Sequence, residues 1–129
     1  MRVGPGAVLS ARQEVTARLT EFGIDPKSSL ADAAQLVVSE LVANVLRHAA
    51  DRSPTADVGV AVAAGQLVIA VTDRESRVPD AATGPPGAGL RVVADLVDEY
   101  DGTLSVEPVR AGHGKTILAR FVIPDADVW

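Results

Sequence analysis

Residues 39–49 of the chain read Ser-Glu-Leu-Val-Ala-Asn-Val-Leu-Arg-His-Ala and carry the most informative pattern in the sequence. Glu40, Asn44 and His48 recur every fourth residue, and each such step advances about 40° around an α-helix, so the three form one polar stripe. A stripe of small and aliphatic side chains lies immediately beside it: Val38, Leu41, Val42, Val45 and Ala49. The stretch therefore predicts an amphipathic helix with Glu40 and Asn44 at the edge of the core.

Glu40 and Asn44 are candidate functional residues because a carboxylate at the edge of a core needs a partner. A carboxylate and an amide one helical turn apart suit Mg²⁺, which prefers oxygen ligands, and such an acid can also act as a general base. A polar helix edge that is satisfied by water or by neighbouring backbone is the alternative. The spacing alone leaves both interpretations open.

The helix that contains this stretch is predicted over residues 29–49, with Ser28 or Ser29 as its N-terminal cap. An earlier helix is predicted over residues 10–22. Ser10 would begin it in a capping box, with a glutamine at the third helical position, and a glycine follows its end.

The rest of the chain predicts a sheet and one further helix. Residues 57–63 and 66–72 are rich in β-branched side chains and are joined by a short turn, which indicates a hairpin. Residues 88–99 repeat the helical spacing, and two more strands are expected at 103–108 and 115–123. Strands joined by short connections favour a mostly antiparallel sheet with helices on one face, an α/β (α+β) two-layer sandwich.

Composition and length restrict the class of protein. The chain has 129 residues, 47% of them apolar, and no cysteine, which predicts one globular domain over residues 1–129 without disulfides. The net charge of −5 argues against binding a nucleic-acid backbone, and the 3% aromatic content argues against stacking on single-stranded bases. We find no stretch of about 18 unbroken apolar residues and no signal-peptide pattern, so we expect a cytoplasmic protein without a membrane span.

Three short segments near the ends of predicted elements carry further candidates. Asp73 follows the strand at 66–72, where its carboxylate can accept a hydrogen bond from a ligand amine; a turn-capping aspartate is the alternative. Residues 87–90 read Gly-Ala-Gly-Leu before a helix, where glycines let backbone amides approach a phosphate; an ordinary loop is the alternative. Residues 114–116 read Gly-Lys-Thr but are not a P-loop, because the first glycine of that motif is absent and a strand follows.

In their order along the chain, these segments resemble the GHKL superfamily of ATPases, which includes histidine kinases, DNA gyrase and MutL. Residues 39–49 resemble the N-box of that superfamily. Asp73 at a strand end, Gly-x-Gly-Leu at 87–90 and Gly-x-Thr at 114–116 follow as they do in the superfamily. The resemblance covers about residues 10–123, and it is greatest to small bacterial serine kinases that act as anti-sigma factors and to their stand-alone ATP-binding relatives.

The resemblance implies a Bergerat-type ATP-binding fold that uses Mg²⁺. Glu40 would match the general base, Asn44 the Mg²⁺ ligand, and Asp73 the residue that accepts from the exocyclic amine of adenine. The other matches are the hinge of the ATP lid and a supporting contact near the adenine: Gly87, Gly89 and Leu90 for the hinge, and Thr116 for the contact.

The resemblance predicts a regulatory serine/threonine kinase and anti-sigma factor. Such a protein binds Mg-ATP, contacts a sigma factor and transfers phosphate to a protein antagonist of the anti-anti-sigma type. A homodimer is a further expectation, whereas direct contact with nucleic acid or a membrane is not expected.

Two alternatives remain. One is a degenerate, non-catalytic module of the same fold that regulates a partner by contact. The distinguishing feature is the segment after Asp73, where Glu75 and Arg77 stand at two positions that are glycine in the superfamily and would fill the adenine pocket. The other is a detached catalytic domain of a histidine kinase, which has less support because no dimerisation helix with a phosphoacceptor histidine is evident.

Overall fold

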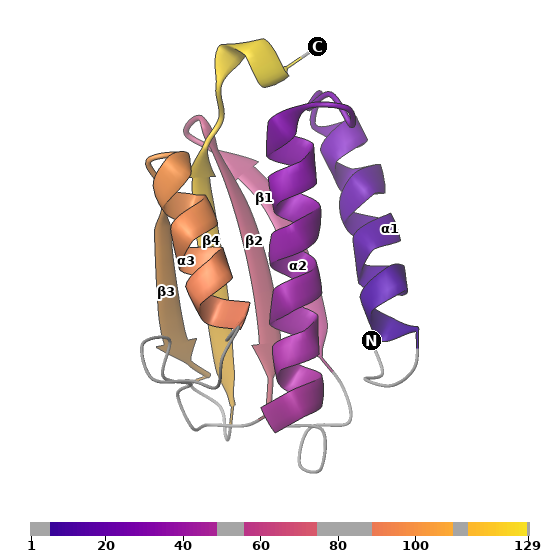
Figure 1. The fold of residues 1–129 in the computed structure, drawn as a ribbon, viewed down its shortest axis with the longest axis vertical. Coiled ribbons are helices and arrows are strands. Elements are labelled where there is room, and N and C mark those ends of the chain that lie inside the picture. The colour runs from indigo at the N-terminus through magenta and orange to yellow at the C-terminus, as the bar shows by residue number, and fades with distance from the viewer. Residues whose placement is uncertain (1–5, 49–55, 75–88, 110–113, 129) are drawn as a thin grey trace.

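The computed structural model describes residues 6–48, 56–74, 89–109 and 114–128. Helices cover one face of a four-stranded sheet, so the fold is the expected two-layer α+β sandwich (Figure 1). The elements in chain order are α1 (Ala7–Glu21), α2 (Ser29–His48), β1 (Asp57–Ala63), β2 (Gln66–Asp73), α3 (Gly89–Glu99), β3 (Thr103–Pro108), β4 (Lys115–Val122) and the short 3-10 helix η1 (Asp125–Asp127).

The sheet has the strand order β1-β2-β4-β3, and all of its neighbouring pairs are antiparallel. The predicted hairpin is confirmed: Ala64 and Gly65, with φ of 53° and 75°, form the turn between β1 and β2. Positive φ at both central residues matches the turn to the twist of the strands. Alternate residues of the central strands β2 and β4 point toward the helices and are buried, as the period of two requires.

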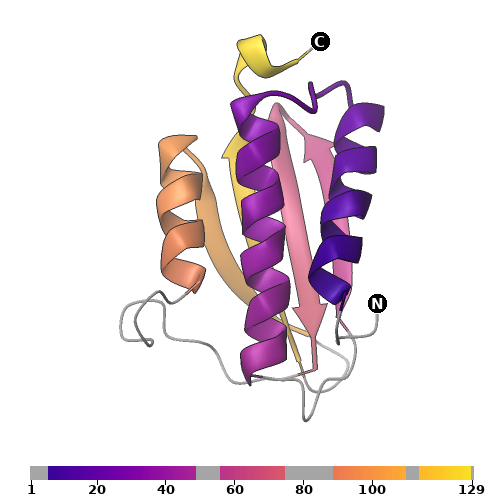
Figure 2. The same cartoon turned by 45° about the vertical axis from the view of Figure 1, so that its right-hand side comes forward.

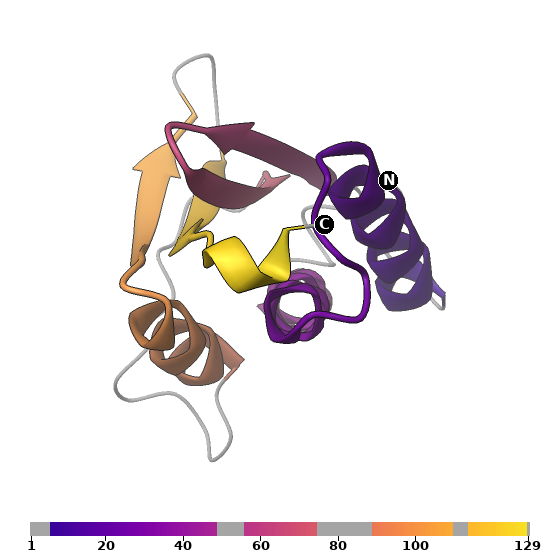
Figure 3. The ribbon, with the colours of Figure 1, turned by 90° about the horizontal axis from the view of Figure 1, so that it is seen from above.

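The helices form one layer with α2 in the middle. α2 packs against β2, α3 packs against β3 and β4, and α1 lies on the other side of α2, as Figure 2 and the view from above in Figure 3 show. The core lies between this layer and the sheet and is mostly aliphatic, with Phe121 as its largest buried side chain. The order of elements expected from the sequence is confirmed.

The predicted start of the first helix is wrong. α1 begins at Ala7 with Gly6 as its N-cap and without a side-chain cap, so Ser10 lies inside the helix. The reason is that Ala7 and Ala11 extend the buried stripe of α1 by another turn toward the N-terminus. Burial of that extra turn against α2 outweighs a local capping box, which is worth about 1 kcal/mol.

α2 begins where the sequence placed it. The hydroxyl of Ser28 accepts a hydrogen bond from the amide of Ala31 at 3.1 Å, and the carboxylate of Asp127 accepts one from the amide of Leu30 at 3.2 Å. By length and composition α2 could cross a membrane, although an 18-residue window of it is 56% buried within the fold. The core helix of a compact domain meets the same criterion, so this is weak evidence for a span.

Candidate functional site

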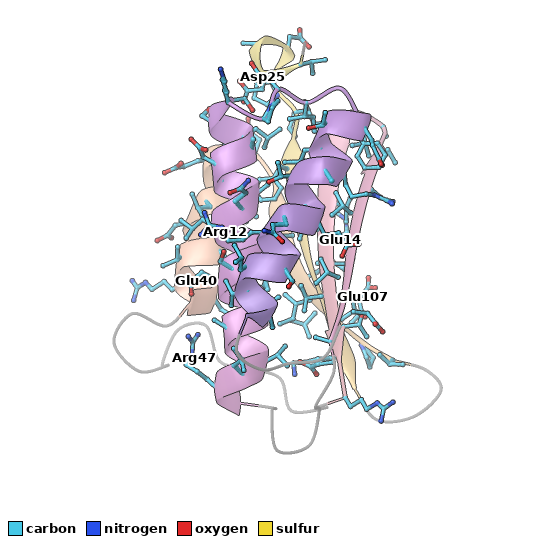
Figure 4. All side chains as sticks on the ribbon, turned by 90° about the vertical axis from the view of Figure 1, so that its right-hand side faces the viewer. Arg12, Glu14, Asp25, Glu40, Arg47 and Glu107 are labelled. Atoms are coloured by element: carbon cyan, nitrogen blue, oxygen red, sulfur yellow. The ribbon has the colours of Figure 1, made fainter. Side chains whose placement is uncertain are left out.

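Glu40 and Asn44 lie on the side of α2 that faces α3. On the opposite side of α2, the amide oxygen of Gln35 accepts a hydrogen bond from Arg12 of α1 at 3.3 Å, and the amide nitrogen donates to Thr16. Nine residues separate Gln35 from Asn44, which turns an α-helix by about 180°. Asn44 therefore lies on the side of α2 away from α1 and toward α3. Glu40, one turn earlier, is half-buried, and Figure 4 shows it on the side of α2 toward α3.

We call the line along which α2 and α3 adjoin the helix seam. Because α2 packs on β2 and α3 packs on β3 and β4, the helix seam runs above the β2–β4 pair. The end of β2, the start of β4, the start of α3 and the C-terminal half of α2 all lie at the same end of the molecule (Figure 1). Five sequence-predicted residues are therefore brought to this end: Glu40, Asn44, Asp73, Gly89 and Leu90.

No described residue forms a hydrogen bond or ion pair with the side chain of Glu40 or Asn44. Asn44 is 4% exposed and Glu40 is half-buried. Among the described residues no hydrogen bond or ion pair joins either side chain, and no fully buried side-chain nitrogen or oxygen is left without a partner. The amide of Asn44 therefore retains a small accessible surface.

Asp73 is paired within the fold. Its carboxylate accepts hydrogen bonds at 3.1 Å on both oxygens from the ammonium of Lys115. The side chains of Asp73 and Lys115 are 2% and 4% exposed, so the ion pair is almost completely buried. The two residues are partners in the antiparallel register of β2 and β4, which places both side chains on the helix-facing side of the sheet.

Gly114 permits this pairing. It has a φ of 138°, and a Cβ at this position would lie 2.3 Å from the carbonyl oxygen of Asp73 and 3.1 Å from Cα of Arg74. No side chain fits there, so only glycine lets the chain approach the end of β2 and place Lys115 opposite Asp73.

Thr116 lies on the other face of the sheet. Its hydroxyl is 2.7 Å from the hydroxyl of Thr72, its partner in the antiparallel register. Since neighbouring residues of a strand point to opposite faces, Thr116 points away from the side on which Asp73 and Lys115 meet. The structure thus does not bring Thr116 together with the other candidates.

The remaining candidates lie around the start of α3. Gly89 is its first residue, and Leu90 is 5% exposed and belongs to the core. Gly87 lies outside the described residues, as do Glu75 and Arg77, the two departures from the superfamily pattern.

Sequence reasoning missed Lys115 as a residue of this site. The signal was present, because Lys115 has the same parity as Ile117, Ala119 and Phe121, which line the buried face of β4. A lysine that continues a buried stripe must have a partner. Finding that partner required the register between β2 and β4, which the sequence does not state.

Within the described part of the chain, no group of three or more His, Cys, Asp or Glu residues could hold a metal ion. A protein-only cage is not what Mg²⁺ requires beside a nucleotide, because the ion commonly keeps waters and phosphate oxygens and takes one or two side chains. The amide of Asn44, which has no partner among the described residues, fits such a single-ligand role.

Comparison with known proteins identifies similar domains. Residues 2–121 match the model of the histidine kinase-like ATPase domain family. A histidine kinase domain from a blue-light-activated kinase of Erythrobacter litoralis is similar over 70% of this chain, with 28% identity and a TM-score of 0.54. The chain covers 43% of that kinase domain. No match was found among curated proteins.

More distant structures share the fold. A mycobacterial sensor histidine kinase, MprB, has a TM-score of 0.54 and 16% identity over 88% of this chain and 91% of its own. The histidine kinase domain of the E. coli osmosensor EnvZ has a TM-score of 0.51 and 20% identity over 96% of this chain and 91% of its own. At these identities the likeness concerns the fold alone.

Proposed function

The chain belongs to the family of histidine kinase-like ATPase domains, and from this premise we propose that it binds Mg-ATP as a regulatory protein of the anti-sigma factor serine/threonine kinase type. In this role it would act in the cytoplasm, contact a sigma factor and phosphorylate a protein antagonist on Ser or Thr. A homodimer is part of the same proposal.

One observation carries the proposal: Glu40 and Asn44 lie together on the α3-facing edge of α2 without a partner among the described residues. An amide and a carboxylate at the edge of the core raise the free energy of the folded protein when they lack hydrogen-bond partners. A ligand or water that forms these hydrogen bonds removes that cost. Asn44 would hold the metal, which when bound neutralises phosphate charge. Glu40 lies one helical turn from Asn44, so it would act beside the same phosphates.

The proposed chemistry of Glu40 is proton acceptance. The γ-phosphoryl group passes to the hydroxyl oxygen of a Ser or Thr of the antagonist, ADP leaves, and the carboxylate of Glu40 takes the hydroxyl proton. Because Glu40 is half-buried at the helix seam, it can reach a substrate hydroxyl without being enclosed by the fold.

The alternative, a non-catalytic module that regulates by contact, has one observation in its favour. The carboxylate of Asp73, which the family resemblance assigns to adenine, already accepts a hydrogen bond from Lys115 on each of its oxygens. A partner within the protein at this position weakens the hydrogen bond that Asp73 could accept from adenine. It therefore favours a protein that keeps the fold but does not catalyse phosphate transfer.

Isothermal titration with ATP, with and without Mg²⁺, tests the shared claim of nucleotide binding. We expect Mg²⁺-dependent binding in the micromolar range. The second step mixes the protein, Mg-ATP and purified candidate antagonist proteins, and detects phosphoserine or phosphothreonine by mass spectrometry.

The variant Glu40→Ala separates the two functions. It should abolish phosphotransfer and leave ATP binding in place, because Glu40 acts on the proton and not on the nucleotide. Ser39→Ala, one residue away on α2, is the matched control and should leave both unchanged. Retained transfer in Glu40→Ala would remove Glu40 as the base, and absence of binding at millimolar ATP would favour the contact module.

A further inference from the structure

We infer that Lys115 sets the base selectivity of the nucleotide site by competing with the base for the carboxylate of Asp73. The inference rests on the proposed function, because it concerns what that site accepts. Lys115 is in this sense a specificity-determining residue that acts through Asp73.

The strand register places Lys115 against the carboxylate of Asp73. β2 ends at Asp73 beneath the helix seam, and the antiparallel register sets Lys115 directly opposite it on the helix-facing side. The ammonium of Lys115 contacts both carboxylate oxygens at 3.1 Å. Gly114 holds the two strand ends at this separation, so the pair is built into the backbone.

The bonds from Lys115 to Asp73 are stronger than a bond from the base would be. An ammonium–carboxylate hydrogen bond is charge-assisted and roughly twice as strong as a bond from a neutral donor such as the exocyclic amine of a purine. The pair is also nearly excluded from water, which strengthens the attraction. A carboxylate keeps further lone pairs, so an amine can still donate to Asp73, but to an acceptor whose charge Lys115 has largely neutralised.

The ion pair lowers the selectivity of the site for a base that carries an amine. A site discriminates strongly for a hydrogen-bonding group when the lack of that group leaves a buried polar partner unpaired. Here Asp73 remains paired with Lys115 whether or not the base carries an amine. A 6-oxo purine can moreover accept from the ammonium. The chain should therefore distinguish poorly between 6-amino and 6-oxo purine nucleotides.

The test is isothermal titration of the full chain and of Lys115→Met with Mg-ATP and with Mg-ITP, which carries an oxo group in place of the amine. Methionine keeps most of the side-chain length without the charge. We expect the wild-type Kd values for the two nucleotides to agree within about threefold. In Lys115→Met, ATP should bind about tenfold more tightly, and the preference for ATP over ITP should rise to about tenfold.

Lys27→Met is the matched control, because it removes the same charge from an exposed lysine in the α1–α2 connection. It should leave both Kd values as in the wild type. A general effect of net charge on nucleotide affinity would appear in both variants and would not change the ratio between ATP and ITP.

Lys115→Arg keeps the test decisive if Lys115→Met does not fold. A guanidinium forms two parallel hydrogen bonds with a carboxylate and should hold Asp73 at least as firmly. Its preference for ATP over ITP should stay within about threefold. A raised preference in Lys115→Arg would overturn the inference.

The outcomes separate the inference from the proposed function. If the wild type binds ATP and Lys115→Met changes neither the affinity nor the ratio, the inference is overturned and the nucleotide site stands. If Lys115→Met binds ATP and the wild type does not, the inference is supported, because Lys115 then prevents ATP from binding at Asp73. If neither binds, both the inference and the nucleotide site are overturned.

Discussion

The two ends of α2 differ in whether their polar groups have hydrogen-bond partners among the described residues. At the N-terminal end, two backbone amides donate to the hydroxyl of Ser28 and the carboxylate of Asp127, and the hydroxyl of Tyr100 donates to Ser29 at 3.1 Å. In the C-terminal half, neither Glu40 nor Asn44 has a partner among the described residues. We call the first region the capped end and the second the site end.

The difference separates polar groups that stabilise the fold from polar groups that no described residue bonds. A helix N-terminus attracts anions, but at the capped end Asp127 already supplies the negative charge. At the site end, the buried ion pair of Asp73 with Lys115 lies on the helix-facing side of the sheet. Substitution of Ser28 at the capped end and of Asn44 at the site end should therefore separate stability from nucleotide binding.

The largest effect on the free energy of unfolding is expected for Gly102→Ala at the capped end. A Cβ on Gly102 would lie 1.7 Å from the carbonyl oxygen of Arg120 and 3.1 Å from that of Val97, and backbone on both sides prevents relief. We expect a loss of about 5 kcal/mol in urea unfolding followed by circular dichroism. Gly59→Ala, whose Cβ would meet only Ala70 Cβ at 3.9 Å, is the control. Equal stability of the two variants would contradict this account of the capped end.

The next largest effect is expected for Asp73→Ala at the site end. It leaves the ammonium of Lys115 buried without its carboxylate, which costs about 3–4 kcal/mol. Chemical denaturation of the double variant Asp73→Ala/Lys115→Met should recover most of that loss, because both charges are gone. If the double variant were no more stable than Asp73→Ala, the pair would not be the source of the penalty.

A smaller effect is expected for Ser28→Ala. Loss of the cap on the amide of Ala31 should lower the free energy of unfolding by about 1 kcal/mol. Ser39→Ala is the control within the same helix, because the Ser39 hydroxyl bonds back to the carbonyl of Gln35 and does not favour the helix. Nucleotide affinity, measured by titration, should be the same in both variants; a change in Ser28→Ala would mean that the two ends are coupled.

The smallest effect on stability, and a large one on binding, is expected for Asn44→Ala. No described residue bonds this amide, and alanine is a better helix former, so the free energy of unfolding should change by less than about 0.5 kcal/mol. Titration with ATP should lose its dependence on Mg²⁺. A clear loss of stability together with unchanged Mg²⁺ dependence would make Asn44 a structural residue.

Much of the fold could be predicted because its signals are local. The period of four in α2, the period of two in β2 and the two-residue turn at Ala64 and Gly65 each follow from neighbouring residues. The start of α1 could not be predicted, because burial of Ala7 and Ala11 against distant residues outweighed the cap that Ser10 offered.

Some features of the candidate site also follow from local sequence, and others depend on the tertiary structure. The sequence by itself determined that Glu40 and Asn44 share one stripe at the edge of a core, because helix geometry alone relates residues four apart. Only the tertiary structure decided that this stripe faces α3, that Asp73 meets Lys115, and that Thr116 turns to the other face of the sheet. The physical reason is that strand register and helix packing join residues about 40 positions apart, as from Asp73 to Lys115, and no local pattern encodes such a pairing.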